Sequence, residues 1–342
     1  PTDQNGLGGF YRSVLSGRKA LILLDNAAER AQVEPLLPPP NCALLVTSRN
    51  KFALPGLKEK DLDVLPLVEA NKLLLSICER IGEHAEELAK LCGCLPLALR
   101  NAAYALKEKP NISVANYTKR LENARKRLEL VEASFDLSYQ LLTQEMQWLW
   151  SLLSVFPADF DLTAAAAVWE MENDAAEEAL GELVKWSLID FMPSAAGEEG
   201  RYKLHDLARD FADSRLDDAG RGPARLLHAR YYQKLLWAAN ELFMVGNDSL
   251  EMGLVLFDMN WMNIKAGQKW ASENKFWSNE IAEICSKFAE AGSILSLRLH
   301  SIENIRWLDA ALGSSRQTKD RNAEGNHLGN LGLASFRLGD PH

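Results

Sequence analysis

The sequence predicts a mainly α-helical protein with a smaller α/β part at its N-terminal end. Two apolar runs, residues 20–24 and 42–46, lie about 20 residues apart and lack period-two alternation, which is typical of strands buried on both faces of a parallel sheet. From residue 69 onward, apolar residues recur instead at helical spacing. A chain of 342 residues, 47% of them hydrophobic and 25% charged, has a globular composition and enough length for two or three domains.

The composition argues against membrane-spanning, secreted and general nucleic-acid-binding proteins. No apolar run approaches the roughly 18 to 20 residues that a membrane helix needs, and residues 1–6 lack the basic and apolar regions of a signal peptide. Five cysteines without disulfide-framework spacing suit a reducing compartment. Cys92 and Cys94 have no second Cys/His pair at zinc-site spacing, so they are expected to be buried thiols. The net charge of −9 argues against a general nucleic-acid or anionic-membrane binder, and we expect a soluble, cytoplasmic protein.

The N-terminal elements follow from apolar spacing and from proline positions. Residues 6–18 are expected to form a loop and a short amphipathic helix. Residues 27–37 form a second helical piece, which the prolines at 38–40 terminate. A third strand is expected at 61–67.

Polar residues end the two apolar strands. Asp25 follows the first strand, and Thr47, Ser48 and Arg49 follow the second. A right-handed crossover between parallel strands brings both polar ends to one sheet edge, where a carboxylate is well placed to hold Mg²⁺ through water. A strand that ends in Asp25-Asn26 is also an ordinary turn signal.

Amphipathic helices are expected between residues 69 and 130. One helical pattern runs into Cys92-Gly93-Cys94-Leu95-Pro96, where glycine is expected to cap one helix and Pro96 to open the next. From the residues alone this junction is structural. Basic residues between 107 and 127 share helical spacing with Leu121 and Leu128, which favours a solvated helix face over a phosphate site.

The stretch from residue 134 to 217 has the element order of a winged helix. Helices are expected at 164–171 and 175–186, and a two-strand wing at 188–192 and 201–204. His205 and Asp206 begin the closing helix. The stretch holds 17 Asp and Glu against 5 Lys and Arg, and this charge would repel a phosphate backbone. We therefore expect an interaction domain, and nucleic acid is an unlikely partner of this region.

Residues 219–342 are expected to be helical throughout. Five tryptophans lie on apolar faces and are expected in the core: Trp237, Trp261, Trp270, Trp277 and Trp307. Residues 328–340 resemble the first helix of a tetratricopeptide repeat, with Leu331-Gly332 and Gly339 in place. Such arrays bind protein partners, and a single begun repeat predicts that the array continues beyond this sequence.

Four motifs occur together in the order found in NB-ARC proteins, the STAND-class nucleotide switches. They are the apolar strand ending in Asp25-Asn26, Leu-Leu-Val-Thr-Ser-Arg at 44–49, Cys-Gly-Cys-Leu-Pro-Leu-Ala-Leu at 92–99, and Tyr-Lys-Leu-His-Asp-Leu at 202–207. The chain most resembles the bacterial NB-ARC regulators that carry tetratricopeptide repeats, and the resemblance covers nearly its whole length.

The resemblance assigns expected roles to individual residues. Asp25 resembles the Walker B acid that helps to hold Mg²⁺. Arg49, with Thr47 and Ser48, resembles the sensor of the terminal phosphate, and a guanidinium suits phosphate oxygens. Pro96, followed by Leu97, resembles the residue that packs near the base and sugar. His205 resembles the histidine that contacts the β-phosphate of ADP in the closed state.

Departures from the family pattern qualify this resemblance. Asn26 stands where many relatives carry a second acid, and an amide cannot act as a base toward water, so slow hydrolysis at most is expected. Cys94 replaces a glycine and Leu204 a methionine. No Gly-x-x-x-x-Gly-Lys-Ser/Thr occurs in the sequence, which predicts that the chain begins after the phosphate loop. Without that loop the chain alone is expected to bind nucleotide poorly.

The resemblance also predicts the domain layout and the function. Residues 1–68 would be the C-terminal part of a P-loop NTPase domain, 69–130 a helical ARC1 domain, 131–217 the winged helix, and 218–342 a helical domain leading into tetratricopeptide repeats. The expected function is an ADP/ATP-dependent switch in signal transduction or transcriptional regulation, with ADP or ATP and Mg²⁺ as ligands and self-oligomerisation on activation. The alternative is a helical scaffold with a vestigial nucleotide site, in which alanine at Asp25 and Arg49 would leave partner interactions unaffected.

Overall fold

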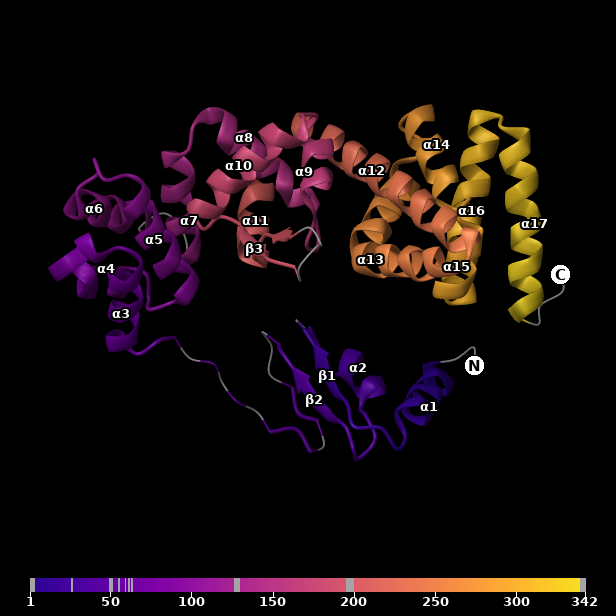
Figure 1. Ribbon diagram of the computed structural model, residues 1–342, viewed down its shortest axis with the longest axis horizontal. Helices are drawn as coiled ribbons and strands as arrows, with labels where there is room; N and C mark the ends of the chain where they lie inside the picture. The colour runs from indigo at the N-terminus through magenta and orange to yellow at the C-terminus, as the bar shows by residue number, and fades with distance from the viewer. Residues whose placement is uncertain are drawn as a thin grey trace. The chain divides into compact units, whose positions relative to one another are not determined.

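The computed structural model describes residues 4–25, 27–48, 52–54, 56–58, 60, 62, 64–125, 130–194 and 200–338. These residues are mainly helical and include two small sheets, which confirms the predicted fold class (Figure 1). They divide into two compact units, Pro1–Asp63 and Val64–His342. No described helix is long and apolar enough to cross a membrane.

The N-terminal unit contains the predicted parallel crossover. Strands β1 and β2 pair in parallel, with Leu21 opposite Ala43 and Leu24 opposite Val46. The chain between them forms a short helix and a 3-10 turn, which the prolines at 38–40 follow as predicted. The elements are α1 (Gln4–Leu15), β1 (Leu21–Leu24), α2 (Arg30–Val33), η1 (Glu34–Leu36) and β2 (Ala43–Val46).

Within the N-terminal unit, the described elements cover the two strands on one face, whereas burial on both faces was predicted. Successive side chains of a strand point to opposite faces. Leu24, Leu44 and Val46 pack with the buried Val33 and Leu54. On the other face, Leu21, Leu23 and Leu45 are 72%, 59% and 55% exposed. The apolar runs therefore predicted the strands correctly. They did not predict that the described elements would leave one face of the strands exposed.

The predicted third strand at 61–67 is also wrong as far as it is described. Lys60, Leu62 and the residues from Val64 to Pro66 form neither helix nor strand, and Leu67 begins a helix. Asp61 and Asp63 lie outside the described residues. The Leu65 N–H donates to the carbonyl oxygen of Cys94 at 3.0 Å, so this segment is hydrogen-bonded to a helix junction rather than to a strand.

A helical subdomain opens the second unit. Its helices surround fully buried leucines at 74, 88, 99 and 106, which lie at the apolar positions that helical spacing predicts. The elements are α3 (Leu67–Ile77), η2 (Glu79–His84), α4 (Ala85–Leu91), α5 (Pro96–Glu108), α6 (Val114–Arg125) and α7 (Leu130–Leu141).

The predicted winged helix is present. Its core contains Phe135, Trp150 and Phe211, whose ring centroids lie 5.9 to 6.5 Å apart, and the indole N–H of Trp150 donates to the Leu188 carbonyl oxygen at 3.3 Å. The wing strands are antiparallel, with Phe191 opposite Tyr202. The elements are α8 (Gln144–Leu152), η3 (Leu153–Val155), α9 (Leu162–Trp169), α10 (Asn173–Lys185), β3 (Asp190–Met192), β4 (Arg201–Lys203) and α11 (Asp206–Ser214).

Helices alone make up the described C-terminal region. The helices α12 (Asp218–Val245) and α13 (Asp248–Asn274) pack closely at Gly253. Any larger residue at this position would clash, since a Cβ atom would lie 2.5 Å from the Ala239 carbonyl oxygen. Of the tryptophans predicted in the core, Trp307 is buried, whereas Trp237 and Trp277 are exposed. The helices are α12 (Asp218–Val245), α13 (Asp248–Asn274), α14 (Asn279–Phe288), α15 (Gly292–Arg298), α16 (Ser301–Thr318) and α17 (Arg321–Leu338), and the repeat-like residues from 328 lie in α17.

Candidate functional site

The polar ends of β1 and β2 meet in the N-terminal unit. The Thr47 hydroxyl donates to the Asp25 carboxylate at 2.5 Å. The strands hold this position, since the Thr47 N–H donates to the Leu24 carbonyl oxygen and the Ala27 N–H to the Thr47 carbonyl oxygen, each at 2.9 Å. The Ser48 hydroxyl donates to the Ala27 carbonyl oxygen at 2.7 Å. Three of the predicted site residues are thus neighbours at one sheet edge.

Oxygen atoms dominate this edge, and Asp25, Thr47 and Ser48 are all exposed. Mg²⁺ prefers oxygen ligands and is commonly held by one or two carboxylates together with water and substrate phosphates. The exposed carboxylate of Asp25, with the Thr47 hydroxyl beside it, fits such a cation. Arg49, the predicted phosphate sensor, and Asn26 lie outside the described residues.

The helix junction at 89–96 has the predicted caps. Gly93 and Cys94 follow α4 in the left-handed region, with φ of 58° and 54°. The Gly93 N–H donates to the Lys90 carbonyl oxygen and the Cys94 N–H to that of Ala89, both at 3.0 Å, which is a Schellman motif. Pro96 then takes the first position of α5, where its missing N–H costs no hydrogen bond.

Replacing Cys94 with glycine is expected to raise the free energy of unfolding by about 0.5 to 1 kcal/mol, because glycine adopts a positive φ without the steric cost that a Cβ atom imposes. Thermal and denaturant unfolding of both proteins measure this difference. Cys94→Ala retains the Cβ atom and is the control, for which no gain is expected. An equal gain from alanine would show that the backbone at Cys94 is not strained.

Arg100 ties α5 to the wing. Its Nη2 atom donates to the Asp190 carboxylate on β3 at 3.0 Å. Pro96 lies one turn before Arg100 on α5, and residues four apart share a helix face. Strand β4 pairs with β3 and ends two residues before His205. This ion pair therefore joins α5, which carries Pro96 and the half-buried Leu97, to the wing that leads to His205.

His205 is the N-cap residue of α11. Its Nδ1 atom accepts the N–H of Leu207 at 3.2 Å, and the side chain is exposed. An imidazole that accepts at Nδ1 carries its proton on Nε2 when it is neutral. The cap therefore fixes the tautomer and leaves Nε2–H as a hydrogen-bond donor. The predicted helix-start position is confirmed, and it is compatible with donation to a phosphate.

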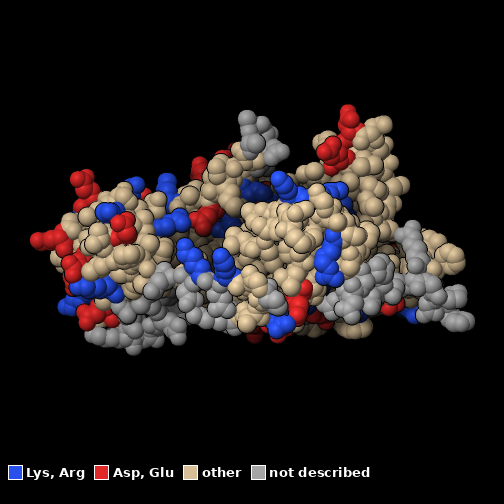
Figure 2. Space-filling view, turned by 90° about the horizontal axis from the view of Figure 1, so that it is seen from below, with Lys and Arg blue, Asp and Glu red and all other residues tan. Residues whose placement is uncertain are grey.

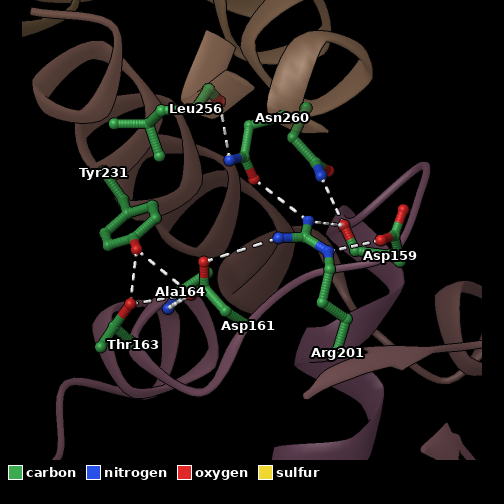
Figure 3. Close-up of polar contacts among 9 residues, drawn as sticks. Asp159, Asp161, Thr163, Ala164, Arg201, Tyr231, Leu256 and Asn260 are labelled. Carbon is green, nitrogen blue, oxygen red and sulfur yellow. Dashed lines mark hydrogen bonds and ion pairs between the residues drawn. The ribbon is translucent and has the colours of Figure 1, made fainter. Parts of the chain in front are cut away.

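A charged network joins the wing to α13 (Figure 3). Arg201, the first residue of β4, donates through Nε to the Asp159 carboxylate and through Nη2 to the Asp159 carbonyl oxygen at 2.9 Å. Nη2 also donates to the Asn260 side-chain oxygen at 3.1 Å, and Nη1 lies 3.8 Å from the Asp161 carboxylate. Because the Arg201 side chain is only 12% exposed, these partners replace the water that the guanidinium has lost.

Asp161 extends this network to α12. As the N-cap of α9, its Oδ1 accepts the Ala164 N–H at 2.7 Å and the Thr163 hydroxyl at 2.8 Å. The Tyr231 hydroxyl on α12 also donates to this oxygen, at 3.2 Å. Burial is the main cause that raises the pKa of Tyr231, so the hydroxyl stays protonated and remains a donor.

A buried imidazole lies in the same junction. His228 on α12 packs against the rings of Phe156 and Tyr232, with centroid distances of 5.2 and 4.7 Å. Burial lowers the pKa of His228 to about 4, so its imidazole is neutral at pH 7. The Asn263 side chain donates to the Asp159 carbonyl oxygen at 2.8 Å and adds another link between α13 and the winged helix.

The described surface of the winged helix carries exposed acidic side chains. On α10, Asp174, Glu177 and Glu178 are exposed. Figure 2 shows one face of the molecule, on which the lysine and arginine side chains of the described residues are scattered among acidic and uncharged ones. A phosphate backbone needs clustered positive charge.

The sequence is similar to several known regulators. A model of the winged helix-turn-helix domain matches residues 142–217. The chain is 40% identical over 227 residues to regulatory protein AfsR of Streptomyces griseus, a match that covers 62% of this chain and 23% of AfsR. A putative HTH-type transcriptional regulator of Mycobacterium bovis is 25% identical over 333 residues, covering 89% of this chain and 37% of that protein. A disease resistance protein of Arabidopsis thaliana is 26% identical over 234 residues, 59% of this chain and 24% of that protein.

A solved structure shares the fold. The crystal structure of a STAND protein (Signal Transduction ATPase with Numerous Domains) with a tetratricopeptide repeat sensor, from Pyrococcus horikoshii, matches 99% of this chain with a TM-score of 0.51 and 17% identity, and 53% of that protein is covered. The chain spans less than half the length of the three relatives above. Taken with the order of the four motifs and the winged helix, these similarities support the resemblance of the chain to NB-ARC, STAND-class regulators.

Proposed function

We propose that the protein is an ADP/ATP-dependent switch in signal transduction or transcriptional regulation. The observation that carries this proposal is the cap at His205, which holds the imidazole as a Nδ1 acceptor and presents an exposed Nε2–H beside the wing. The similarity to proteins named as regulators supports the functional class. The similarity in fold to a STAND protein with a repeat sensor supports the architecture.

In this proposal the predicted residues of each unit contact ADP or ATP. Asp25 would help to hold Mg²⁺, and Thr47, Ser48 and Arg49 would contact the terminal phosphate. The ion, when bound, neutralises phosphate charge. Pro96 and Leu97 pack near the base and sugar, and the Nε2–H of His205 donates to the β-phosphate of ADP. ADP stabilises a closed state in this way, and exchange for ATP releases the winged helix.

Hydrolysis is slow in this proposal. Asn26 follows Asp25 where a second carboxylate would serve as a base, and an amide does not accept a proton from water. The state of the switch would then be set by nucleotide exchange rather than by turnover. Protein partners bind the C-terminal helical region, where the repeat-like residues of α17 lie, and activation promotes self-oligomerisation.

Replacing His205 with serine in the intact protein is expected to weaken ADP retention about tenfold or more, because serine keeps an N-cap oxygen but removes the imidazole donor. ADP release is measured by the displacement of a fluorescent ADP analogue. The chain offers a matched control at His300, which caps α16 in the same way, with Nδ1 accepting the Ile302 N–H at 3.3 Å. His300→Ser is expected to retain ADP. Equal retention in wild type and both variants would refute the role of His205.

A further inference from the structure

The outward face of α13 carries a continuous apolar stripe. Four apolar side chains recur at steps of three, four and three residues, with exposed fractions of 61%, 48%, 48% and 56%: Met252, Val255, Met259 and Met262. We call these residues the α13 stripe. Phe257 and Ile264 are buried on the other side of α13, which packs against α12 and α14. The stripe is therefore an outer face, separate from the core of the unit.

The spacing and chemistry of the α13 stripe fit a second helix. Steps of three and four residues are the seam of a coiled coil, in which side chains of one helix fill gaps on the other. Three of the four residues are methionines, whose flexible thioethers adapt to a partner surface. At 1.5 Å per residue the stripe is about 15 Å long. An interface of this size is small, so association is expected to depend on concentration.

Charged residues beside the stripe are arranged with opposite signs at its two ends. Asp248 and Glu251 are exposed in the first turn of α13. Lys265 and Lys269 are exposed two and three turns beyond the centre of the stripe. Within the chain, Lys265 pairs with Glu303 at 2.9 Å and Lys269 lies 3.9 Å from the Glu273 carboxylate, so a second copy would share these cations. A helix laid alongside in the antiparallel direction with the same charge order would place each acid beside a lysine. A parallel copy would place acid beside acid and lysine beside lysine.

The register of such a pair follows from the stripe. With Val255 opposite Met259 of the second copy, Glu251 lies within one helical turn of Lys265 of that copy, and Asp248 lies within one turn of its Lys269. Asp258 would meet its own counterpart near the two-fold axis. Its charge is already compensated, because Arg298 Nη2 lies 2.5 Å from its carboxylate.

We propose that the α13 stripe is a self-association surface on which a second copy of the chain docks antiparallel across a two-fold axis. The contact uses residues of α13 alone and none of the residues assigned to the nucleotide. Unlike the self-oligomerisation proposed on activation, this contact should form to the same extent with and without ADP, which separates its test from that of the switch.

Light scattering of the full chain across a concentration series tests the surface. A monomer–dimer equilibrium is expected, and Met259→Glu should raise the dissociation constant about tenfold or more by burying a carboxylate in an apolar contact. Phe276→Glu is the control, because Phe276 is 75% exposed but lies outside the α13 stripe. A chain that is monomeric throughout, or a dimer that Met259→Glu leaves intact, would overturn the proposal.

Charge exchange tests the antiparallel register. The double variants Asp248→Lys/Glu251→Lys and Lys265→Glu/Lys269→Glu should each lose the dimer, because like charges then face each other across the axis. An equimolar mixture of the two should recover it, since every flanking pair is again opposite in sign. Circular dichroism confirms that both variants are folded before mixing. Failure of two folded variants to associate on mixing would overturn the antiparallel arrangement.

Discussion

Replacing Arg201 with alanine is expected to lower the free energy of unfolding of the Val64–His342 unit by about 3 kcal/mol. The substitution removes the cation from between Asp159 and Asp161, whose side chains are only 33% and 17% exposed. It also removes the donor to the Asn260 side-chain oxygen. A buried acceptor that loses its donor adds its own desolvation cost. Denaturant unfolding followed by circular dichroism measures the loss.

An exposed ion pair elsewhere in the same unit is the control. Arg230 on α12 bonds to Glu280 on α14, and their side chains are 37% and 52% exposed. Arg230→Ala is expected to cost less than about 1 kcal/mol, because water solvates both charges once the pair is broken. Arg201→Lys should fall between the two, since an ammonium cannot reproduce the fork of hydrogen bonds. If both alanine substitutions lowered the free energy of unfolding equally, the stabilisation by the Arg201 network would not depend on its burial.

Acidification is expected to destabilise the folded protein through His228 by about 3 kcal/mol between pH 6.5 and pH 4. The pKa of this imidazole is lowered from 6.5 to about 4 in the folded protein, chiefly because of burial. In the unfolded chain it binds a proton below about pH 6.5, whereas in the folded chain it stays neutral until about pH 4. The contribution is therefore fully present above pH 6.5 and is lost as pH falls through this range.

The difference between wild type and His228→Phe isolates this contribution. Phenylalanine fills a similar volume beside Phe156 and Tyr232 and does not titrate. The pKa of His327 is also lowered, mainly by burial, but that group is common to both proteins and cancels in the difference. The stability of wild type should fall more steeply than that of the variant below pH 6.5. Parallel curves would mean that His228 takes up its proton equally in the folded and unfolded states.

Local patterns in the sequence predicted a large part of the fold. Apolar spacing located the two parallel strands and the helices, and Gly93 and Pro96 marked a helix junction with the caps that the structure has. His205 was expected at the start of a helix, and it is the N-cap of α11. Each of these features depends on residues within one or two helical turns of each other, which is why sequence reasoning could find them.

Features that depend on distant contacts were missed. Arg201 reads as an ordinary strand residue, and its partners Asp159 and Asn260 lie 42 and 59 residues away. Among the residues of this network, only Asp161 has a local sequence signal, because an acid just before an apolar helix indicates an N-cap. The third strand was wrongly predicted because Leu65 bonds to the junction at Cys94. The one-sided covering of β1 and β2 was likewise beyond local patterns, since an apolar run does not reveal how many layers surround it.

The nucleotide content of the intact protein tests the switch most directly. The purified protein is denatured by heat, the released nucleotide is identified and quantified by ion-exchange chromatography, and the intact mass of the chain is measured alongside. About one ADP per chain is expected, retained through purification because the closed state releases it slowly, and less ADP is expected in His205→Ser. An intact protein that carries no nucleotide, and takes up neither ADP nor ATP in the presence of Mg²⁺, would contradict the proposed switch.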